Sequence, residues 1–161
     1  MNIELGYEAF YAVILGSDQG RELYKKKLIR LYEQYRMINQ IRFIDHCEDM
    51  ALAYKVSDIV VSTSVEPEAF GRVAVEAQSM EKLIIASDIG GSNETVIDEK
   101  TGYLFKSGDA QSLSQKILKA ITLDEISLKS IGAEGRKNII QKFNVERMCF
   151  STYSEYKRIL N

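Results

Sequence analysis

One segment constrains the architecture of this chain more than any other: Glu66-Pro67-Glu68-Ala69-Phe70-Gly71-Arg72-Val73-Ala74-Val75-Glu76-Ala77. The short β-branched run Ile59–Ser62 precedes it and is typical of a buried strand. Apolar residues at positions 73, 77 and 80 follow at helical spacing. The segment therefore predicts a strand, a loop and a helix that begins near Gly71.

Two carboxylates flank this predicted helix start. Glu68 lies in the loop and Glu76 projects from the second turn, with seven residues between them. The first backbone N–H groups of a helix have no partner within it, and the helix dipole adds positive charge there. Because such a helix start attracts phosphate, the segment predicts an anion site beside two acidic side chains.

Length and composition indicate one globular domain. The 161 residues are 45% hydrophobic, and a chain of this length buries about 68–70% of its unfolded surface. We expect a single domain over residues 1–161, with 122–161 as its helical tail. The 21 basic and 23 acidic residues nearly cancel, so no broad electric field favours nucleic acid or an anionic membrane as a partner.

The two cysteines and the lengths of the apolar runs indicate in which cellular compartment the protein is expected. Cys47 and Cys149 lie far apart without metal-ligand spacing, which argues against a disulfide scaffold or a zinc site and suits a reducing cytoplasm. No apolar run approaches the roughly 18 residues of a membrane span, and residues 1–10 lack a signal-peptide pattern. We expect a soluble, cytoplasmic protein.

Short apolar runs alternate with helical patterns, which is typical of parallel βαβ units. The predicted strands are Phe10–Leu15, Ile41–Ile44, Ile59–Ser62, Leu83–Ala86 and Tyr103–Phe105. The predicted helices are Arg21–Ile38, Glu48–Val56, one from near Gly71, Asn93–Ile97, one capped by Asp109, Asp124–Lys142 despite Gly132 and Gly135, and one capped by Asn144. This order predicts an α/β fold with a Rossmann-like parallel sheet flanked by helices, whose ligand binds at the carboxyl ends of the strands.

Together the motifs resemble the retaining glycosyltransferases of family 4, in the carboxyl-terminal nucleotide-sugar-binding half of their GT-B fold. The matching residues are Glu68 and Glu76 around Phe70-Gly71, Gly90-Gly91 with Glu94, and Gly102-Tyr103-Leu104. The resemblance extends from Phe10 to about Ile121. The variant at residues 67–72 is similar to bacterial enzymes of cell-envelope glycan assembly.

The resemblance implies a role for each site residue. Glu76 would accept hydrogen bonds from the ribose hydroxyls, and Glu68, as the catalytic carboxylate, would hold hydroxyls of the donor sugar. Backbone amides would stabilise the diphosphate at Phe70, Gly71, Arg72 and Val73. Gly16 would line the donor cleft, and the base would be bordered by Ile44, Asp45 and His46. The implied substrates are a UDP-, GDP- or ADP-sugar and a glycan or lipid-linked acceptor, with no cofactor and no metal.

Several of these residues have a second interpretation. The Arg72 side chain either reaches a phosphate or points to solvent. Glu94 either braces the turn at Gly90-Gly91, where glycine permits close approach of a ligand, or touches substrate. His46 is the single histidine of the chain, and a lone histidine is more often structural or solvated than catalytic. Asp45 is more typical of a turn residue than of a catalytic acid.

The chain departs from the family pattern in extent. Relatives have two Rossmann-like halves with the active site between them, whereas this sequence matches one half. The strand that opens that half, and the arginine and lysine that follow it, find no match in residues 1–7. We therefore expect weak donor binding and negligible transfer by this chain without a separate N-terminal half. The longer enzyme would be cytoplasmic or peripheral at the inner face of the membrane.

Two other functions remain open at this point. The chain could be a non-catalytic module of a split enzyme, which binds nucleotide or a partner chain. A dinucleotide-dependent oxidoreductase is disfavoured, because the turn Gly16–Gly20 lacks the Gly-x-Gly-x-x-Gly spacing.

Overall fold

The computed structural model describes residues 10–160. The chain divides into two compact units, Met1–Ala53 and Tyr54–Asn161, and each is described by itself. The single domain expected over 1–161 stays a prediction. The expectation that residues 1–7 contain no first strand falls outside the described residues.

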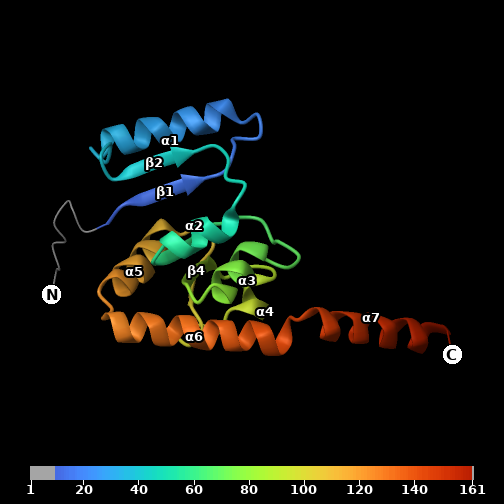
Figure 1. The fold of residues 1–161 in the computed structure, drawn as a ribbon. Helices are drawn as coiled ribbons and strands as arrows, with labels where there is room; N and C mark the ends of the chain where they lie inside the picture. Colours follow the sequence, from blue (N-terminus) through green and yellow to red (C-terminus); the bar gives the residue numbers. More distant parts are fainter. Residues whose placement is uncertain (1–9, 161) are drawn as a thin grey trace. The chain divides into compact units, whose positions relative to one another are not determined.

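The described part of the first unit, residues 10–53, contains two parallel strands, the helix that connects them and the first turn of α2 (Met50–Val56) (Figure 1). Strand β1 (Ala12–Leu15) pairs with β2 (Ile41–Ile44), and Ala12 lies opposite Ile41. Helix α1 (Glu22–Gln34) connects them. It ends before the predicted Ile38, because the chain leaves helical geometry at Arg36, whose φ is +56°.

The second unit contains a three-stranded parallel sheet in the order β3-β4-β5. Its strands are β3 (Ile59–Ser62), β4 (Leu83–Ser87) and β5 (Tyr103–Phe105). Its helices are α3 (Arg72–Ser79), α4 (Ser92–Thr95), α5 (Ala110–Ile121), α6 (Glu125–Lys142) and α7 (Val145–Leu160), together with the last turn of α2 (Met50–Val56). All five predicted strands are present.

The strands form two parallel sheets, β1-β2 in the first unit and β3-β4-β5 in the second. Parallel pairing and flanking helices are confirmed. The apolar pattern identifies a strand and its buried faces, but it does not specify which strand edges form hydrogen bonds with each other.

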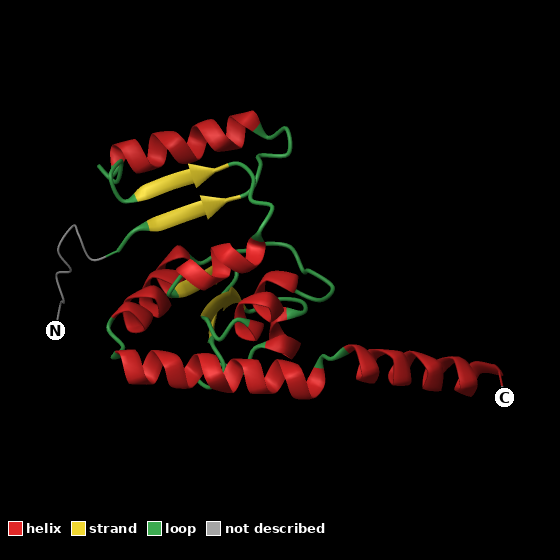
Figure 2. Cartoon of the chain, viewed as in Figure 1, coloured by secondary structure: helices red, strands yellow, loops and turns green. Residues whose placement is uncertain are grey.

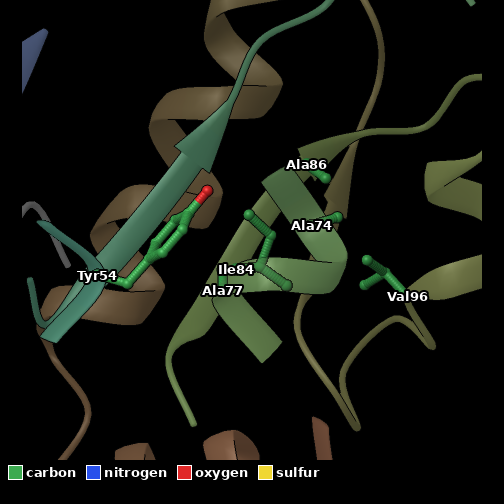
Figure 3. Close-up of a cluster of buried hydrophobic side chains, with 6 residues drawn as sticks. All are labelled: Tyr54, Ala74, Ala77, Ile84, Ala86 and Val96. Atoms are coloured by element: carbon green, nitrogen blue, oxygen red, sulfur yellow. The ribbon is translucent and has the colours of Figure 1, made fainter. Parts of the chain in front are cut away.

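Strand β4 is the centre of the core of the second unit. Its five residues are all buried, as expected for a parallel strand covered on both faces. Successive side chains point to opposite faces, so Ile84 joins one cluster with Tyr54 and Val96, while Leu83 and Ile85 join a second cluster. Figure 3 shows the first cluster, with the Tyr54 ring on one side of Ile84 and Val96 on the other.

The predicted helix caps are confirmed. The Asp109 carboxylate accepts hydrogen bonds from the amides of Gln111 and Ser112 at 3.0 Å each. The Asn144 Oδ1 atom accepts from the Arg147 amide at 2.8 Å. These caps satisfy amides that have no partner inside the helix. Helices α6 and α7 of the predicted tail follow one another as separate helices (Figure 2).

The glycines of α6 allow this helix to lie against the turn that follows α3. A Cβ atom on Gly132 would lie 2.1 Å from the carbonyl oxygen of Glu81, and one on Gly135 would lie 3.1 Å from Cγ of Gln78. Close to this contact, the Thr95 carbonyl accepts hydrogen bonds from the side-chain amides of Gln78 at 3.1 Å and Asn138 at 3.2 Å. These buried polar contacts join α3, α4 and α6.

No helix within residues 10–160 combines the length and the apolar character that a bilayer-crossing segment needs.

Candidate functional site

The start of α3 presents unpaired amides at the carboxyl end of the sheet. Gly71 precedes the helix with φ +72° and ψ +59°, a left-handed conformation that glycine adopts without strain. Its carbonyl accepts from the amides of Ala74 and Val75 at 3.0 and 3.3 Å. Within the described residues no side chain caps this helix. The amides of Arg72 and Val73, which cannot bond within the helix, are therefore available to an anion.

Glu76 lies one turn further along α3 and has a partner on each carboxylate oxygen. Its Oε2 atom accepts a hydrogen bond from the Tyr54 hydroxyl at 2.8 Å. Its Oε1 atom accepts from the Arg72 guanidinium at 3.0 Å. The Glu76 side chain is 34% exposed, so solvent or a ligand can still reach it.

Tyr54 is buried, at 6% exposure, whereas Arg72, the other partner of Glu76, is exposed. Burial, reinforced by the hydrogen bond to the Glu76 carboxylate, raises the pKa of the Tyr54 hydroxyl far above its usual range. The hydroxyl is therefore protonated near neutral pH, and it donates a hydrogen bond to the Glu76 carboxylate.

This shift predicts a loss of stability in alkali. In the unfolded chain tyrosine ionises near pH 10, whereas folded Tyr54 retains its proton because its pKa is raised. The resulting stability is fully present below about pH 10 and is lost as the pH rises further. In Tyr54→Phe the free energy of unfolding should fall less steeply between pH 9 and pH 11 (on the order of one pH unit either side of the tyrosine pKa), as measured by urea titration. Equal slopes in both proteins would contradict the assignment.

Glu68 lies in the loop that connects β3 to α3. Its side chain is exposed, and its Oε1 atom accepts a hydrogen bond from the Ser64 hydroxyl. Its main-chain carbonyl accepts from the Gly91 amide at 2.8 Å. The loop is thus tied to the Gly90-Gly91 turn through its backbone, while the carboxylate remains accessible.

Gly90 and Gly91 contact this loop at a distance that no side chain would permit. A Cβ atom on Gly90 would lie 2.6 Å from the Glu68 carbonyl oxygen, and one on Gly91 would lie 2.4 Å from the carbonyl carbon of Phe70. The close approach predicted at this turn is therefore made by the protein's own loop. Glu94 is exposed, and no hydrogen bond or ion pair of its side chain is present in the described part of the chain. A bracing role for that side chain is not observed.

Phe70 anchors the loop and is itself partly open to solvent. Its ring packs edge-to-face on Phe143, with ring centroids 5.8 Å apart, and 45% of the residue is exposed. The Phe143 ring, at the end of α6, supports the motif from a distant part of the sequence.

Four of the predicted residues lie in the first unit, at the carboxyl ends of β1 and β2. They are Gly16, Ile44, Asp45 and His46. The Gly16 amide donates to the Ile44 carbonyl at 2.9 Å, the Asp45 carboxylate pairs with Lys25 at 2.5 Å, and His46 is exposed. Their place beside the donor stays a prediction.

Sequence reasoning missed three residues of the site: Tyr54, Ser64 and Phe143. Ser64 stands four residues before Glu68, a spacing that could have suggested a local contact. Tyr54 and Phe143 have no local signal, because each meets the motif through tertiary packing. Among the described residues no cluster of three potential metal ligands occurs, and whether the reaction needs a metal stays untested.

The sequence profile of the family described as "Glycosyl transferases group 1" matches residues 5–138. The chain is 32% identical over 117 residues to the capsular polysaccharide biosynthesis glycosyltransferase CapM of Staphylococcus aureus, across 73% of this chain and 30% of that protein. It thus spans about a third of that relative's length.

Solved structures show the same fold. A glycosyltransferase from Rickettsia africae superposes with a TM-score of 0.84 and 32% identity, over 94% of this chain and 40% of that one. Anabaena Alr3699/HepE, in complex with UDP and glucose, superposes with a TM-score of 0.82 and 27% identity, over 91% and 40% of the two chains. The fold corresponds to the carboxyl-terminal half of a GT-B glycosyltransferase, and the chain belongs to the glycosyl transferases group 1 family.

Proposed function

We propose that this chain forms the donor-binding half of a glycosyltransferase, holding a nucleoside diphosphate sugar at the start of α3. The observation that carries the proposal is the uncapped, glycine-initiated helix with the Glu76 carboxylate one turn away. The amides of residues 70–73 would bind the diphosphate, and Glu76 would accept hydrogen bonds from the ribose hydroxyls. The UDP bound by the Anabaena relative supports a nucleotide ligand.

Arg72 supplies the mobile charge of this site. Its side chain is 84% exposed, and an exposed pair at this helical spacing contributes only about 0.3–0.5 kcal/mol. The guanidinium can therefore leave Glu76 and contact the diphosphate when a donor binds. The positive end of α3 and Arg72 would together stabilise the negative charge that grows on the leaving diphosphate during transfer.

Glu68 is the proposed catalytic carboxylate. Only one of its oxygens has a partner within the described residues, the Ser64 hydroxyl, so the other is free to accept from hydroxyls of the donor sugar. This contact would orient the sugar for transfer, which we propose to proceed with retention of anomeric configuration, as in the family 4 enzymes. The role of Glu68 is positioning by hydrogen bonds, and no proton transfer is assigned to it.

The acceptor and its binding residues are proposed to lie outside this chain. The chain covers only 30–40% of the relatives compared, and the capsular relative supports an acceptor in envelope polysaccharide synthesis, either a glycan or a lipid-linked one. The free cysteines Cys47 and Cys149 support a reducing, cytoplasmic setting. We therefore expect donor binding by this chain and no measurable sugar transfer by it alone.

Calorimetric titration with UDP, GDP and ADP tests the proposal. We expect one nucleotide to bind the wild type, and Glu76→Ala to weaken that binding at least about tenfold, because hydrogen bonds to a charged group contribute roughly 1.5–3 kcal/mol each. Glu134→Ala is the matched control, since Glu134 is a helical glutamate paired with Lys137 in α6.

The control variant should bind as the wild type does. If none of the nucleotides binds, or if both variants bind equally well, the donor site is not at α3. Robust sugar transfer by the chain alone would refute the placement of the acceptor site elsewhere.

A further inference from the structure

We infer that Tyr54 is a positioning residue, which fixes the Glu76 carboxylate so that it can accept both hydroxyls of the donor ribose. The inference rests on the proposed function of the α3 site. Tyr54 reaches Glu76 from another helix, α2, and its hydroxyl donates to Oε2 at 2.8 Å. It would contact the carboxylate and not the ligand.

The Tyr54 ring is held in place by the core. It belongs to the buried cluster that contains Ala74 and Ala77 of α3 and Ile84 of β4. Ala74 and Ala77 lie on the buried side of the helix that carries Glu76, and their small side chains leave room for the ring beside that helix (Figure 3). The hydroxyl therefore stays at a fixed position relative to Glu76.

The two partners of Glu76 differ in how firmly they are held. Arg72 is a flexible side chain on the surface, whereas Tyr54 is buried at 6% exposure. When Arg72 leaves for the diphosphate, Tyr54 remains as the one partner within the described residues that sets the rotation of the carboxylate. A carboxylate has about four acceptor positions, so Tyr54 occupies one and leaves enough for a ribose diol.

A neutral donor suits this task better than a cation would. The raised pKa keeps Tyr54 protonated, so it donates one directed hydrogen bond and leaves the negative charge of Glu76 uncompensated. The ribose hydroxyls then make charge-assisted hydrogen bonds, which are shorter and stronger than neutral ones. A lysine or arginine in the place of Tyr54 would have weakened them.

The test compares UDP with 2′,3′-dideoxy-UDP by calorimetry, because only UDP carries the hydroxyls that Glu76 would bind. We expect the wild type to prefer UDP by at least about tenfold. In Tyr54→Phe, which keeps the ring and its packing, this preference should fall to about threefold or less, since the carboxylate is no longer oriented. Loss of fold alone would weaken the binding of both ligands equally and leave the ratio of their affinities unchanged.

Two further variants complete the comparison. Tyr103→Phe removes the hydroxyl of another buried tyrosine of the same unit, at 1% exposure, and should keep the wild-type preference. In a Glu76→Ala background, Tyr54→Phe should change the ratio no further, because the two residues act as one unit. An unchanged preference in Tyr54→Phe, or an equal loss in Tyr103→Phe, overturns the role of Tyr54 while leaving the donor site in place.

A spectroscopic measurement keeps the Tyr54 hydroxyl in place. 3-Fluorotyrosine introduced at position 54 should show a 19F shift that moves further with UDP than with 2′,3′-dideoxy-UDP, because both ligands carry the diphosphate that draws Arg72 from Glu76 and only UDP carries the ribose hydroxyls. Equal movement with both ligands contradicts the inference. If the wild type binds UDP with no preference over the dideoxy compound, the ribose contact of Glu76 is wrong, and the role of Tyr54 is overturned with it.

Discussion

Gly132→Ala should lower the free energy of unfolding by roughly 3 kcal/mol, the upper end of the usual range for overpacking. Inside a helix, alanine is normally more stable than glycine by about 1 kcal/mol, so the expected sign is reversed here. The reason is the Cβ atom, which would lie 2.1 Å from the Glu81 carbonyl oxygen. That neighbour is backbone and cannot rotate away, so α6 must shift from the turn after α3.

Ser130→Ala is the matched control, because Ser130 is an exposed residue of the same helix. It should be neutral or slightly stabilising, since alanine has the higher helix propensity. Urea unfolding followed by circular dichroism measures both. A Gly132→Ala protein as stable as the wild type would show that α6 does not make this contact.

Gly91→Ala should lower the free energy of unfolding by a similar amount, about 3 kcal/mol. It should also weaken nucleotide binding. Its Cβ atom would meet three backbone atoms of Phe70 at 2.4 to 2.6 Å. The Gly91 backbone has an ordinary φ of −61°, so the cost is purely steric. Relief requires the Glu68–Phe70 loop to move, which breaks the hydrogen bond from the Gly91 amide to Glu68 and displaces the residues just before α3.

Gly108→Ala separates this effect from a general intolerance of alanine at glycine positions. Gly108 has φ +73°, and no atom lies within 4 Å of the position that a Cβ atom would take there. The variant therefore bears only the roughly 1–2 kcal/mol strain of a left-handed residue, and it should bind UDP as the wild type does. Melting curves with and without UDP measure stability and binding together, and equal binding by the Gly91 and Gly108 variants would refute the coupling of turn and loop.

The fold was predictable wherever a local pattern specified it. Ile41–Ile44, Ile59–Ser62 and Tyr103–Phe105 are strands with the predicted bounds, because each is a short apolar run between turn residues. The end of α1 was missed because a left-handed Arg36 has no sequence signature. Gly132 and Gly135 were read as unfavourable to α6, whereas the structure uses them for close packing.

The segments that form the candidate site were predictable from the sequence, whereas the residues that hold them in place were not. The spacing of Glu68 and Glu76 and the Gly90-Gly91 turn identified the segments that meet at α3. The hydroxyl of Tyr54 could not be assigned to Glu76, because the two residues are 22 positions apart with a strand between them, and only the packing of the Tyr54 ring against α3 brings them together. Local periodicity carries no information on such pairs.

Strand β4 limits how fast the backbone of the site can move. It is buried along its whole length, it has a neighbour on each edge, and it leads directly into the Gly90-Gly91 turn. A segment of this kind opens only when the whole unit unfolds, whereas exposed loops move on nanosecond to microsecond timescales. The Glu68–Phe70 loop, which contacts that turn, should therefore move as slowly as the core, and fast motion at the candidate site should be confined to individual side chains such as Arg72.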